Sequence, residues 1–251
     1  TYTNYHLLLI DDGSRDGTAD MVSAAIPNLT VLRGSGNWWW AGSLHQGYLW
    51  LRKTGVSPGE MVLIINDDSE FAEDFLELAT AWLENHSRTM LLAQAYSRTT
   101  GKLRDAGVHA DWRRFRFEPL PPPEQINCLS TRGLFFRVGD FLQVGGFYPR
   151  LLPHYGSDYE FTMRARRRGL KLATDPAVRL WMDEDATGNH SLKGLPVITY
   201  MRKLFSRKTP ANPIFFSIFI ALSCPVPYVP LNWLRVWAGA AGGMIARVAG
   251  R

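Results

Sequence analysis

Short apolar runs alternate with longer amphipathic stretches through the first 95 residues of the chain. The runs consist mainly of Leu, Ile, Val and Ala, a pattern typical of buried strands. They occupy residues 7–10, 30–33, 61–66 and 90–95. The stretches with helical spacing cover about residues 17–26, 41–53 and 72–85. This alternation of strand and helix predicts a parallel sheet with helices on both faces.

Pairs of acidic residues follow two of these runs directly. Asp11 and Asp12 end LLLIDD, and Asp67 and Asp68 follow LIIN. Ligands of parallel sheets bind beyond the carboxyl ends of the strands, so we expect both pairs at one edge of the sheet. Two carboxylate pairs suit Mg²⁺ or Mn²⁺, which prefer oxygen ligands and keep coordination sites for the phosphates of a substrate. The alternative is that each pair caps a turn or a helix.

The middle of the chain predicts fewer regular elements. Residues 96–126 contain the turn RTTGK and the proline-rich loop EPLPPPEQ, so we expect irregular structure there. The later patterns predict a strand pair around CLSTRGLFFRV, a helix from near Ser157 to Gly169, and a strand in KLATDPAVRLW. Four arginines lie between positions 164 and 168, near the end of that helix. A solvated helix face is favoured for them over a phosphate clamp.

The C-terminal segment differs in kind from the rest. Residues 211–234 contain no charged residue. A basic cluster precedes them, made of Arg202, Lys203, Arg207 and Lys208. Prolines interrupt the apolar stretch, so it does not resemble a continuous spanning helix of about 20 residues. We expect peripheral membrane contact through residues 202–234, with packing on the protein's own surface as the alternative. The predicted domains are residues 1–200 and an extension over 201–251.

Composition bounds the class of protein without selecting a partner. The 251 residues are 46% apolar and 20% charged, as in ordinary globular proteins. The net charge of +5 permits an anionic substrate or lipid, and we expect no nucleic-acid partner. The two cysteines are too few for a disulfide framework, which favours a reducing compartment, and the first residues have no signal-peptide pattern. The P-loop and dinucleotide-binding motifs are missing from the first strand and its turn.

Four segments of the chain carry motifs in an informative order. They read LLLIDDGSRDGTADM, GNWWWAGSLHQG, LIINDDSEF and LSTRGLFFRVGDFLQVGGFYPRLLPHYGSDYEFTMRARRRG. Together they resemble the family 2 inverting glycosyltransferases of the GT-A fold, in particular rhamnosyltransferases. The first resembles VVDDGSxDGT, the second N-x-G-x-A-x-x-x-N-x-G, the third a DXD-type motif in its NxD form, and the fourth the acceptor-side block. The resemblance covers about residues 5–185, and we expect the family's first strand and helix to be missing.

This resemblance implies the fold and the donor site. The fold class is α/β, a doubly wound mixed sheet with helices on both faces, and the donor is a nucleoside-diphosphate sugar. The residues that the resemblance assigns to the nucleotide sugar are Asp11, Asp12, Asn37, Asn66 and Asp67. It assigns the metal, Mg²⁺ or Mn²⁺, to Asp68. His190 is a further candidate ligand, and Asp183 or Asp185 would serve in its place.

The resemblance also implies the catalytic and acceptor residues. It places the catalytic base at Asp158, because inversion needs one carboxylate that deprotonates the acceptor hydroxyl as it attacks C1. A helix N-cap is the alternative for Asp158, since it opens the arginine-rich helix. The residues expected to contact the acceptor or its sugar are Trp39, Trp40, His154 and Glu160. Burial in the core is the alternative for the tryptophans.

These features predict an inverting, metal-assisted glycosyltransferase. The expected acceptor is a hydroxyl of a glycan or lipid-linked molecule in bacterial surface polysaccharide synthesis, at the cytoplasmic face of the cell membrane. A non-catalytic sugar-nucleotide or glycan-binding protein on the same fold is the alternative. An aspartyl-phosphate enzyme is disfavoured, because it needs an Asp-x-Asp spacing where residues 11–13 read Asp-Asp-Gly.

Overall fold

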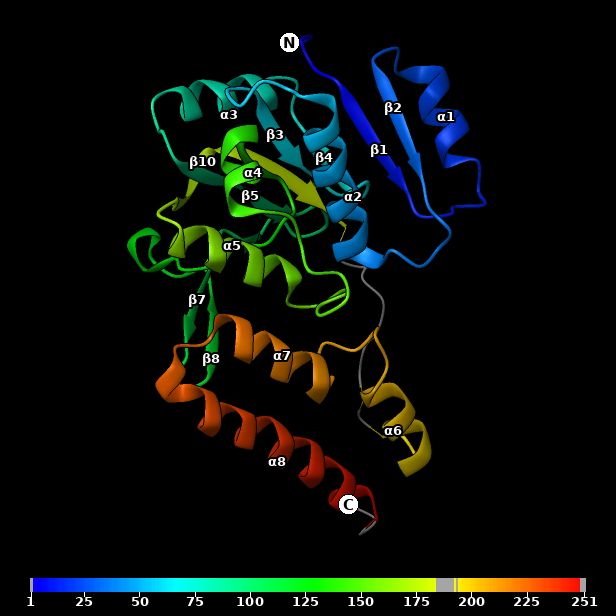
Figure 1. Cartoon of the computed structure of the whole chain (residues 1–251), viewed down its shortest axis with the longest axis vertical. Helices are drawn as coiled ribbons and strands as arrows, with labels where there is room; N and C mark the ends of the chain where they lie inside the picture. The colour runs from blue at the N-terminus through cyan, green and yellow to red at the C-terminus, as the bar shows by residue number, and fades with distance from the viewer. Residues whose placement is uncertain (1, 184–191, 193, 249–251) are drawn as a thin grey trace.

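A mixed sheet forms the centre of the molecule, and helices cover both of its faces (Figure 1). The computed structural model describes residues 2–183, 192 and 194–248. Strands and helices are interspersed along the chain up to the last strand, and helices follow to the end of the described chain. The C-terminal helices lie together at the end of the molecule opposite the N-terminus (Figure 1).

The central sheet has the strand order β3-β9-β5-β10-β4, and β6 pairs with β5. Its strands are β3 Met61–Ile64, β4 Ser69–Phe71, β5 Thr89–Ser97, β6 Leu103–Asp105, β9 Leu134–Arg137 and β10 Lys171–Met182. β5 and β10 are parallel, whereas β9 runs antiparallel to both β3 and β5. The sheet is therefore mixed, as the resemblance to the glycosyltransferases implies.

Strand β5 is covered on both faces by helices. These are α2 Trp39–Thr54, α3 Phe75–Glu84, α4 Val138–Val144 and α5 Ser157–Arg167. Leu91 and Ala93 of β5 pack in one apolar cluster with Phe75 of α3. Met90 and Leu92 pack in a second cluster with residues of α2, α4 and α5. Because successive side chains of a strand point to opposite faces, a strand buried on both sides needs an uninterrupted apolar run.

The first two strands form a separate sheet. β1 (Leu7–Asp11) and β2 (Leu29–Arg33) pair in parallel and are joined through α1 (Thr18–Ala25). Within the described part of the chain neither strand pairs with β3, which pairs with β9 instead. The single parallel sheet expected over residues 1–95 is thus wrong in its pairing. An apolar run predicts a strand, but it carries no information about the neighbouring strand.

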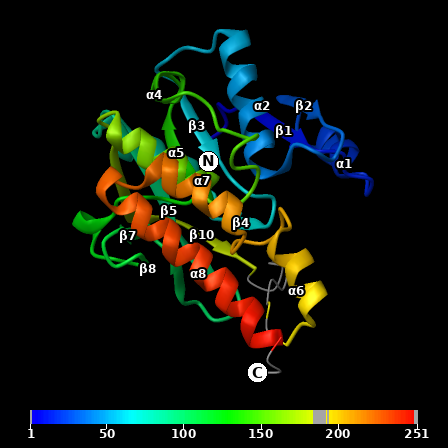
Figure 2. The ribbon, with the colours of Figure 1, turned by 60° about the horizontal axis from the view of Figure 1, so that its bottom comes forward.

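The C-terminal segment is helical and packs on the rest of the fold. It contains α6 Val197–Leu204, α7 Pro213–Ser223, the 3₁₀ turn η2 Val226–Tyr228 and α8 Val229–Val248. Helices α7 and α8 lie side by side (Figure 2). None of the helices in the described ranges is long and apolar enough to cross a membrane.

A hairpin joins this helical segment to the sheet region. It consists of β7 Val108–Asp111 and β8 Arg116–Pro119, and the 3₁₀ turn η1 Pro123–Gln125 follows it. Phe219 of α7 packs in a cluster with Val108, Leu152 and Met163. The fully buried Asn232 of α8 donates from Nδ2 to the Trp112 carbonyl at 2.9 Å. These contacts attach α7 and α8 to the hairpin and to α5.

Candidate active site

The first acid pair, at the end of β1, organises the loop between β2 and α2. The Asp12 carboxylate accepts hydrogen bonds from the backbone N–H groups of Gly36 at 2.8 Å, Trp38 at 2.8 Å and Trp39 at 3.0 Å. Trp39 has a φ of 58°, a left-handed conformation that is unusual for a side chain of this size. Charge-assisted bonds of this kind are strong, so Asp12 fixes the start of α2.

Asp11 makes its hydrogen bond in a different segment, the turn that directly follows β1. Its Oδ1 accepts from the Ser14 N–H at 2.7 Å, and this bond holds the pKa of Asp11 below its usual value. Arg33 Nη1 lies 3.8 Å from Asp11 Oδ2. Asn37, which was expected at the nucleotide sugar, is exposed beside the start of α2. The structure therefore brings Asp11, Asp12 and Asn37 together in one loop cluster.

The second acid pair carries oxygens that lack partners. Asn66 Oδ1, Asp68 Oδ1 and Ser69 Oγ are buried, and none of them has a hydrogen-bond partner among the described residues. Buried polar atoms are normally bonded, so three such oxygens in four residues indicate a place for a ligand. Asp68 Oδ2 lies 3.6 Å from Arg132 Nη1, while Asp67 is exposed.

A short chain of contacts links the two acid pairs. Trp40 Nε1, in the first turn of α2, donates to Thr131 Oγ1 at 3.1 Å. Thr131 is buried, and its neighbour Arg132 contacts Asp68. The loop that Asp12 fixes and the motif that holds Asp68 thus meet at the same end of the fold, although β1 and β3 are not paired. Trp40 supports this junction through its ring N–H.

Asp158 lies at the start of α5, in a pocket of about 240 Å³. Its Oδ1 accepts from the Tyr159 N–H at 3.0 Å, and Oδ2 accepts no hydrogen bond from the described residues. Burial raises the pKa of Asp158 to about 6, with the Tyr159 N–H opposing this rise and the negative charge of Asp105 adding to it. A carboxyl group tuned in this way is suited to accept a proton near neutral pH.

Two residues from different parts of the chain connect this pocket to the loop that Asp12 holds. His154 lines the pocket, and its ring lies 6.0 Å from that of Trp39 in an edge-on arrangement. Lys208 Nζ lies 5.7 Å from the Trp39 ring centroid. Trp39 and His154, both expected at the acceptor or sugar, therefore lie between the acid loop of β1 and the pocket at Asp158.

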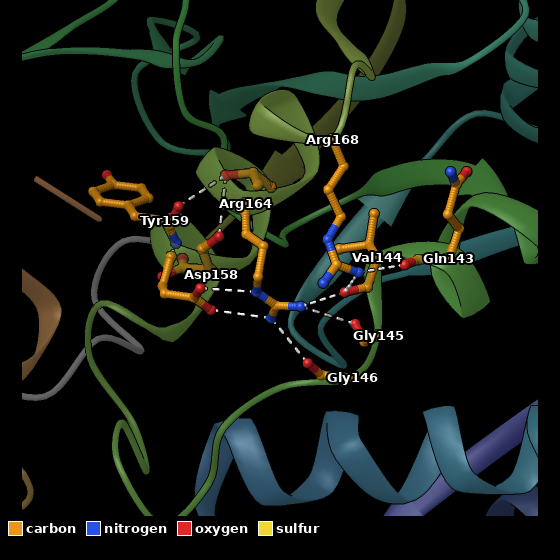
Figure 3. Close-up of polar contacts among 10 residues, drawn as sticks. Gln143, Val144, Gly145, Gly146, Asp158, Tyr159, Arg164 and Arg168 are labelled. Atoms are coloured by element: carbon orange, nitrogen blue, oxygen red, sulfur yellow. Dashed lines mark hydrogen bonds and ion pairs between the residues drawn. The ribbon is translucent and has the colours of Figure 1, made fainter. Parts of the chain in front are cut away.

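Glu160 occupies a different environment from the one expected. It is 2% exposed, and its two carboxylate oxygens accept from Arg164 Nε at 2.8 Å and Nη2 at 3.0 Å. Arg164 also donates to the carbonyls of Val144 and Gly146, at 2.5 and 2.9 Å (Figure 3). Glu160 is thus part of a buried brace that joins α5 to the end of α4, and we do not place it at the acceptor.

The arginines of α5 divide between buried and exposed positions, which differs from the solvated face expected for them. Arg164 is 8% exposed, and Arg168 donates to the carbonyls of Gln143 and Val144. Arg166 and Arg167 are exposed. The spacing of four residues between Glu160 and Arg164 is a signal from which this pair could have been predicted.

The remaining metal candidates are less well placed. His190 and Asp185 lie outside the described residues. Asp183 lies within them, and its Oδ2 accepts from Arg98 Nη2 at 3.0 Å. In the described ranges no group of three or more His, Cys, Asp or Glu residues is close enough to hold a metal ion. The unpartnered oxygens of residues 66–69 fit a cation that takes its other ligands from a substrate, as Mg²⁺ commonly does.

The sequence motifs missed the second wall of the pocket. Helix α7 and the segment before it supply half of the lining residues, namely Arg207, Thr209, Pro210, Phe215, Phe216 and Phe219. The other six are Phe117, His154, Tyr155, Gly156, Asp158 and Tyr159. The density of aromatic residues in PIFFSIF was the available signal, but the sequence pattern fits a lipid contact equally well.

Three solved structures share this fold with low sequence identity. GalNAc-T7 with UDP, GalNAc and Mn²⁺ has a TM-score of 0.58 at 14% identity, over 85% of this chain and 41% of its own. TarS 1–349 from S. aureus has a TM-score of 0.54 at 16% identity, over 97% and 71%. The mannosyltransferase PcManGT from Pyrobaculum calidifontis, in complex with GDP-Man and Mn²⁺, has 0.51 at 15%, over 97% and 76%. The fold is therefore that of the GT-A glycosyltransferases.

The sequence itself gives the family. The model described as Glycosyl transferase family 2 matches residues 1–142, more than half of the chain. The chain belongs to glycosyl transferase family 2. No curated protein sequence matches it. It spans 41% of the length of the GalNAc-T7 chain, and less than half of a longer TarS structure.

Proposed function

We propose that this chain transfers a sugar, with inversion, from a nucleoside-diphosphate sugar to a hydroxyl of a glycan or lipid-linked acceptor. Membership of family 2 supports glycosyl transfer, and two structures of the same fold contain UDP or GDP-Man. The observation that carries the proposal is Asp158, a carboxylate with a raised pKa in a pocket of about 240 Å³, whose Oδ2 accepts no hydrogen bond from the described residues.

Asp158 is the proposed catalytic base. The acceptor hydroxyl enters the pocket, its oxygen attacks C1 of the donor sugar, and its proton passes to Asp158 Oδ2. The bond from C1 to the diphosphate breaks on the opposite face, which gives inversion. The Tyr159 N–H holds Oδ1, so the carboxylate keeps one orientation during proton transfer.

The proposed donor site consists of the two acid segments. Asp11, Asp12 and Asn37 shape the loop for the nucleoside, and Asn66 with Asp67 lies at the sugar and diphosphate. Asp68 would hold Mg²⁺ or Mn²⁺, because its buried Oδ1 has no partner within the described ranges. The bound ion would act as a Lewis acid that offsets negative charge on the leaving diphosphate.

The proposed place of action is the cytoplasmic face of a bacterial membrane, in surface polysaccharide synthesis. Residues 186–251 contain eight Lys or Arg and no Asp or Glu, which favours anionic lipid. Leu234 is 65% exposed on α8, and Trp233 and Trp237 are exposed beside it. Exposed apolar side chains with nearby cations fit an interfacial helix, so we assign peripheral membrane contact to residues 202–234, within the extension 201–251.

A screen of sugar nucleotides with Mn²⁺ or Mg²⁺ tests the function. Released nucleoside diphosphate is measured for the wild-type chain and for Asp158→Asn. We expect metal-dependent release from one donor, and its loss in the variant. Binding of a sugar nucleotide without release, with the same heat of binding in both proteins, would instead identify a non-catalytic binding protein.

A further inference from the structure

The segment before α7 is a fixed part of the pocket at Asp158. Thr209, which is buried, donates from Oγ1 to the Lys203 carbonyl at 2.6 Å. Asn212, which is 2% exposed, donates from Nδ2 to the Ser206 carbonyl at 3.1 Å and caps α7 through its Oδ1. Two buried polar side chains therefore hold this turn closed, and they place Arg207 at the pocket.

The walls of the pocket are aromatic. Phe117 stacks with Tyr159 at 6.2 Å between ring centroids, and Phe117 lies 5.9 Å from Phe219. Phe216 lies 5.8 Å from Phe219 in an edge-on arrangement. Aromatic pairs at these distances pack favourably, so the wall is built before a ligand arrives. A wall of ring faces and edges suits the C–H side of a sugar ring.

The pocket is lined by one acidic and one basic side chain, which do not pair with each other. Asp158 is the one carboxylate among the lining residues, and Arg207 is the one Lys or Arg side chain among them. Arg207 is exposed, and it forms no ion pair or hydrogen bond with the described residues, while Lys208 faces the Trp39 ring. A neutral sugar needs no such pair of cations. An arginine with five free donors is instead well suited to the oxygens of a phosphate.

We propose that this pocket binds an acceptor whose sugar carries a phosphate or diphosphate ester, and that Arg207 and Lys208 bind the ester. The inference rests on the function proposed above and adds the chemical class of the acceptor. The sugar lies between the aromatic walls with one hydroxyl at Asp158, and the ester lies at the mouth of the pocket. A lipid-linked sugar diphosphate and a free sugar phosphate share this chemistry.

Binding measurements with the donor site filled test the proposal. Calorimetry is done with saturating Mn²⁺ and the nucleoside diphosphate that binds best. The three probes are glucose 1-phosphate, farnesyl-diphospho-N-acetylglucosamine and the neutral methyl glucoside. We expect Arg207→Gln and Lys208→Gln each to raise the Kd of phosphorylated probes about tenfold, as for a lost charged hydrogen bond. The Kd of methyl glucoside and of the nucleoside diphosphate should change less than twofold.

The control is Lys53→Gln, which removes an exposed cation from the last turn of α2, outside the segment 202–234. It should leave each Kd unchanged. If the Arg207 and Lys208 variants bind both phosphorylated probes equally more weakly, the proposal is supported and the ester alone determines recognition. If they bind only the farnesyl probe more weakly, the proposal is supported and the acceptor is lipid-linked. Loss of nucleoside diphosphate binding in Arg207→Gln would overturn it, because the cation would then serve the donor. So would wild-type binding of the phosphorylated probes no tighter than that of methyl glucoside.

Failure of the underlying function has a separate signature. If the chain is not a glycosyltransferase of this kind, the wild type shows no metal-dependent release of nucleoside diphosphate from any donor. That measurement uses the wild-type chain and does not depend on the Arg207 and Lys208 variants. The acceptor proposal can therefore fail while donor turnover in water stays intact.

Discussion

Replacing Asp158 by Asn should abolish turnover and stabilise the fold in the same variant. The amide keeps the shape of the carboxylate and can still accept the Tyr159 N–H at Oδ1. It cannot take a proton from the acceptor hydroxyl. Removal of a general base typically lowers the rate by about 10²- to 10⁴-fold, so kcat should fall by that factor while donor binding is retained.

The magnitude of the stability change follows from the pKa of the side chain. Burial raises the pKa of Asp158 from 3.8 to about 6. The folded state therefore binds more protons than the unfolded state between these values, and wild-type stability falls as pH rises through this range. At 1.36 kcal/mol per pKa unit the ionised form costs at most about 3 kcal/mol. Solvent in the pocket reduces this cost to about 1–2 kcal/mol.

Urea unfolding at pH 5 and pH 8 measures this effect directly. The amide of the Asp158→Asn variant does not titrate, so the variant should exceed the wild type in stability at pH 8, and the difference should shrink at pH 5. Asp74→Asn is the control, because Asp74 is exposed at the start of α3 and makes no capping hydrogen bond through its side chain. A variant that keeps a tenth of wild-type kcat would refute the assignment of the base. A stability difference independent of pH would refute the argument from burial.

Three further predictions test other parts of the site and of the surface. Arg164→Met leaves Glu160 buried without its partner, so it should lower the free energy of unfolding in urea by about 3–5 kcal/mol. Arg166→Met, on the exposed face, should lower it little. The double variant E160Q/R164M should recover part of the stability lost in Arg164→Met. Asp68→Asn should weaken Mn²⁺ binding in the presence of nucleoside diphosphate at least tenfold by calorimetry, and an unchanged affinity would remove Asp68 from the metal site. Leu234→Ser should reduce the sedimentation of the protein with phosphatidylglycerol vesicles, while Leu78→Ser, which changes an exposed leucine of α3, should not. An equal loss of sedimentation in both variants would contradict membrane contact through α8. Equally strong binding of the wild type to neutral phosphatidylcholine vesicles would also contradict it.

The positions of strands and helices follow from local periodicity, and the pairing of strands does not. The stretch predicted as a helix over 41–53 is α2, and the strand predicted in KLATDPAVRLW is β10. Both have a strong pattern that tertiary contacts do not override. The partner of β3 is β9, which follows much later in the chain, so this pairing depends on long-range packing and not on local periodicity. No apolar run in the sequence contains that information.

The candidate site likewise contains residues that the sequence predicts and residues that only tertiary packing brings together. Asp158 is predictable because it opens a helix within a recognisable segment, and the structure places it in a pocket. Glu160 lies two positions later, and its spacing of four residues from Arg164 predicts the ion pair, but the burial of that pair against the end of α4 depends on tertiary packing. Arg207 and Phe216 come from a segment about fifty residues downstream, and only the packing of α7 on α5 brings them to Asp158. Long-range packing of this kind leaves no local signature.

The two tryptophans of α8 connect this helix to α7, and the connection bears on the position of the pocket. Trp233 Nε1 donates to the Ser217 carbonyl at 2.9 Å, and Trp237 Nε1 donates to Ser217 Oγ at 3.1 Å, so both rings are anchored on α7. The opposite side of α7 supplies the aromatic wall of the pocket. Packed helices lie about 8–10 Å apart between their axes, so if α8 rests on a bilayer, α7 holds the pocket at a set height above that surface. The protein would then select acceptors by the distance between their reacting hydroxyl and the membrane surface.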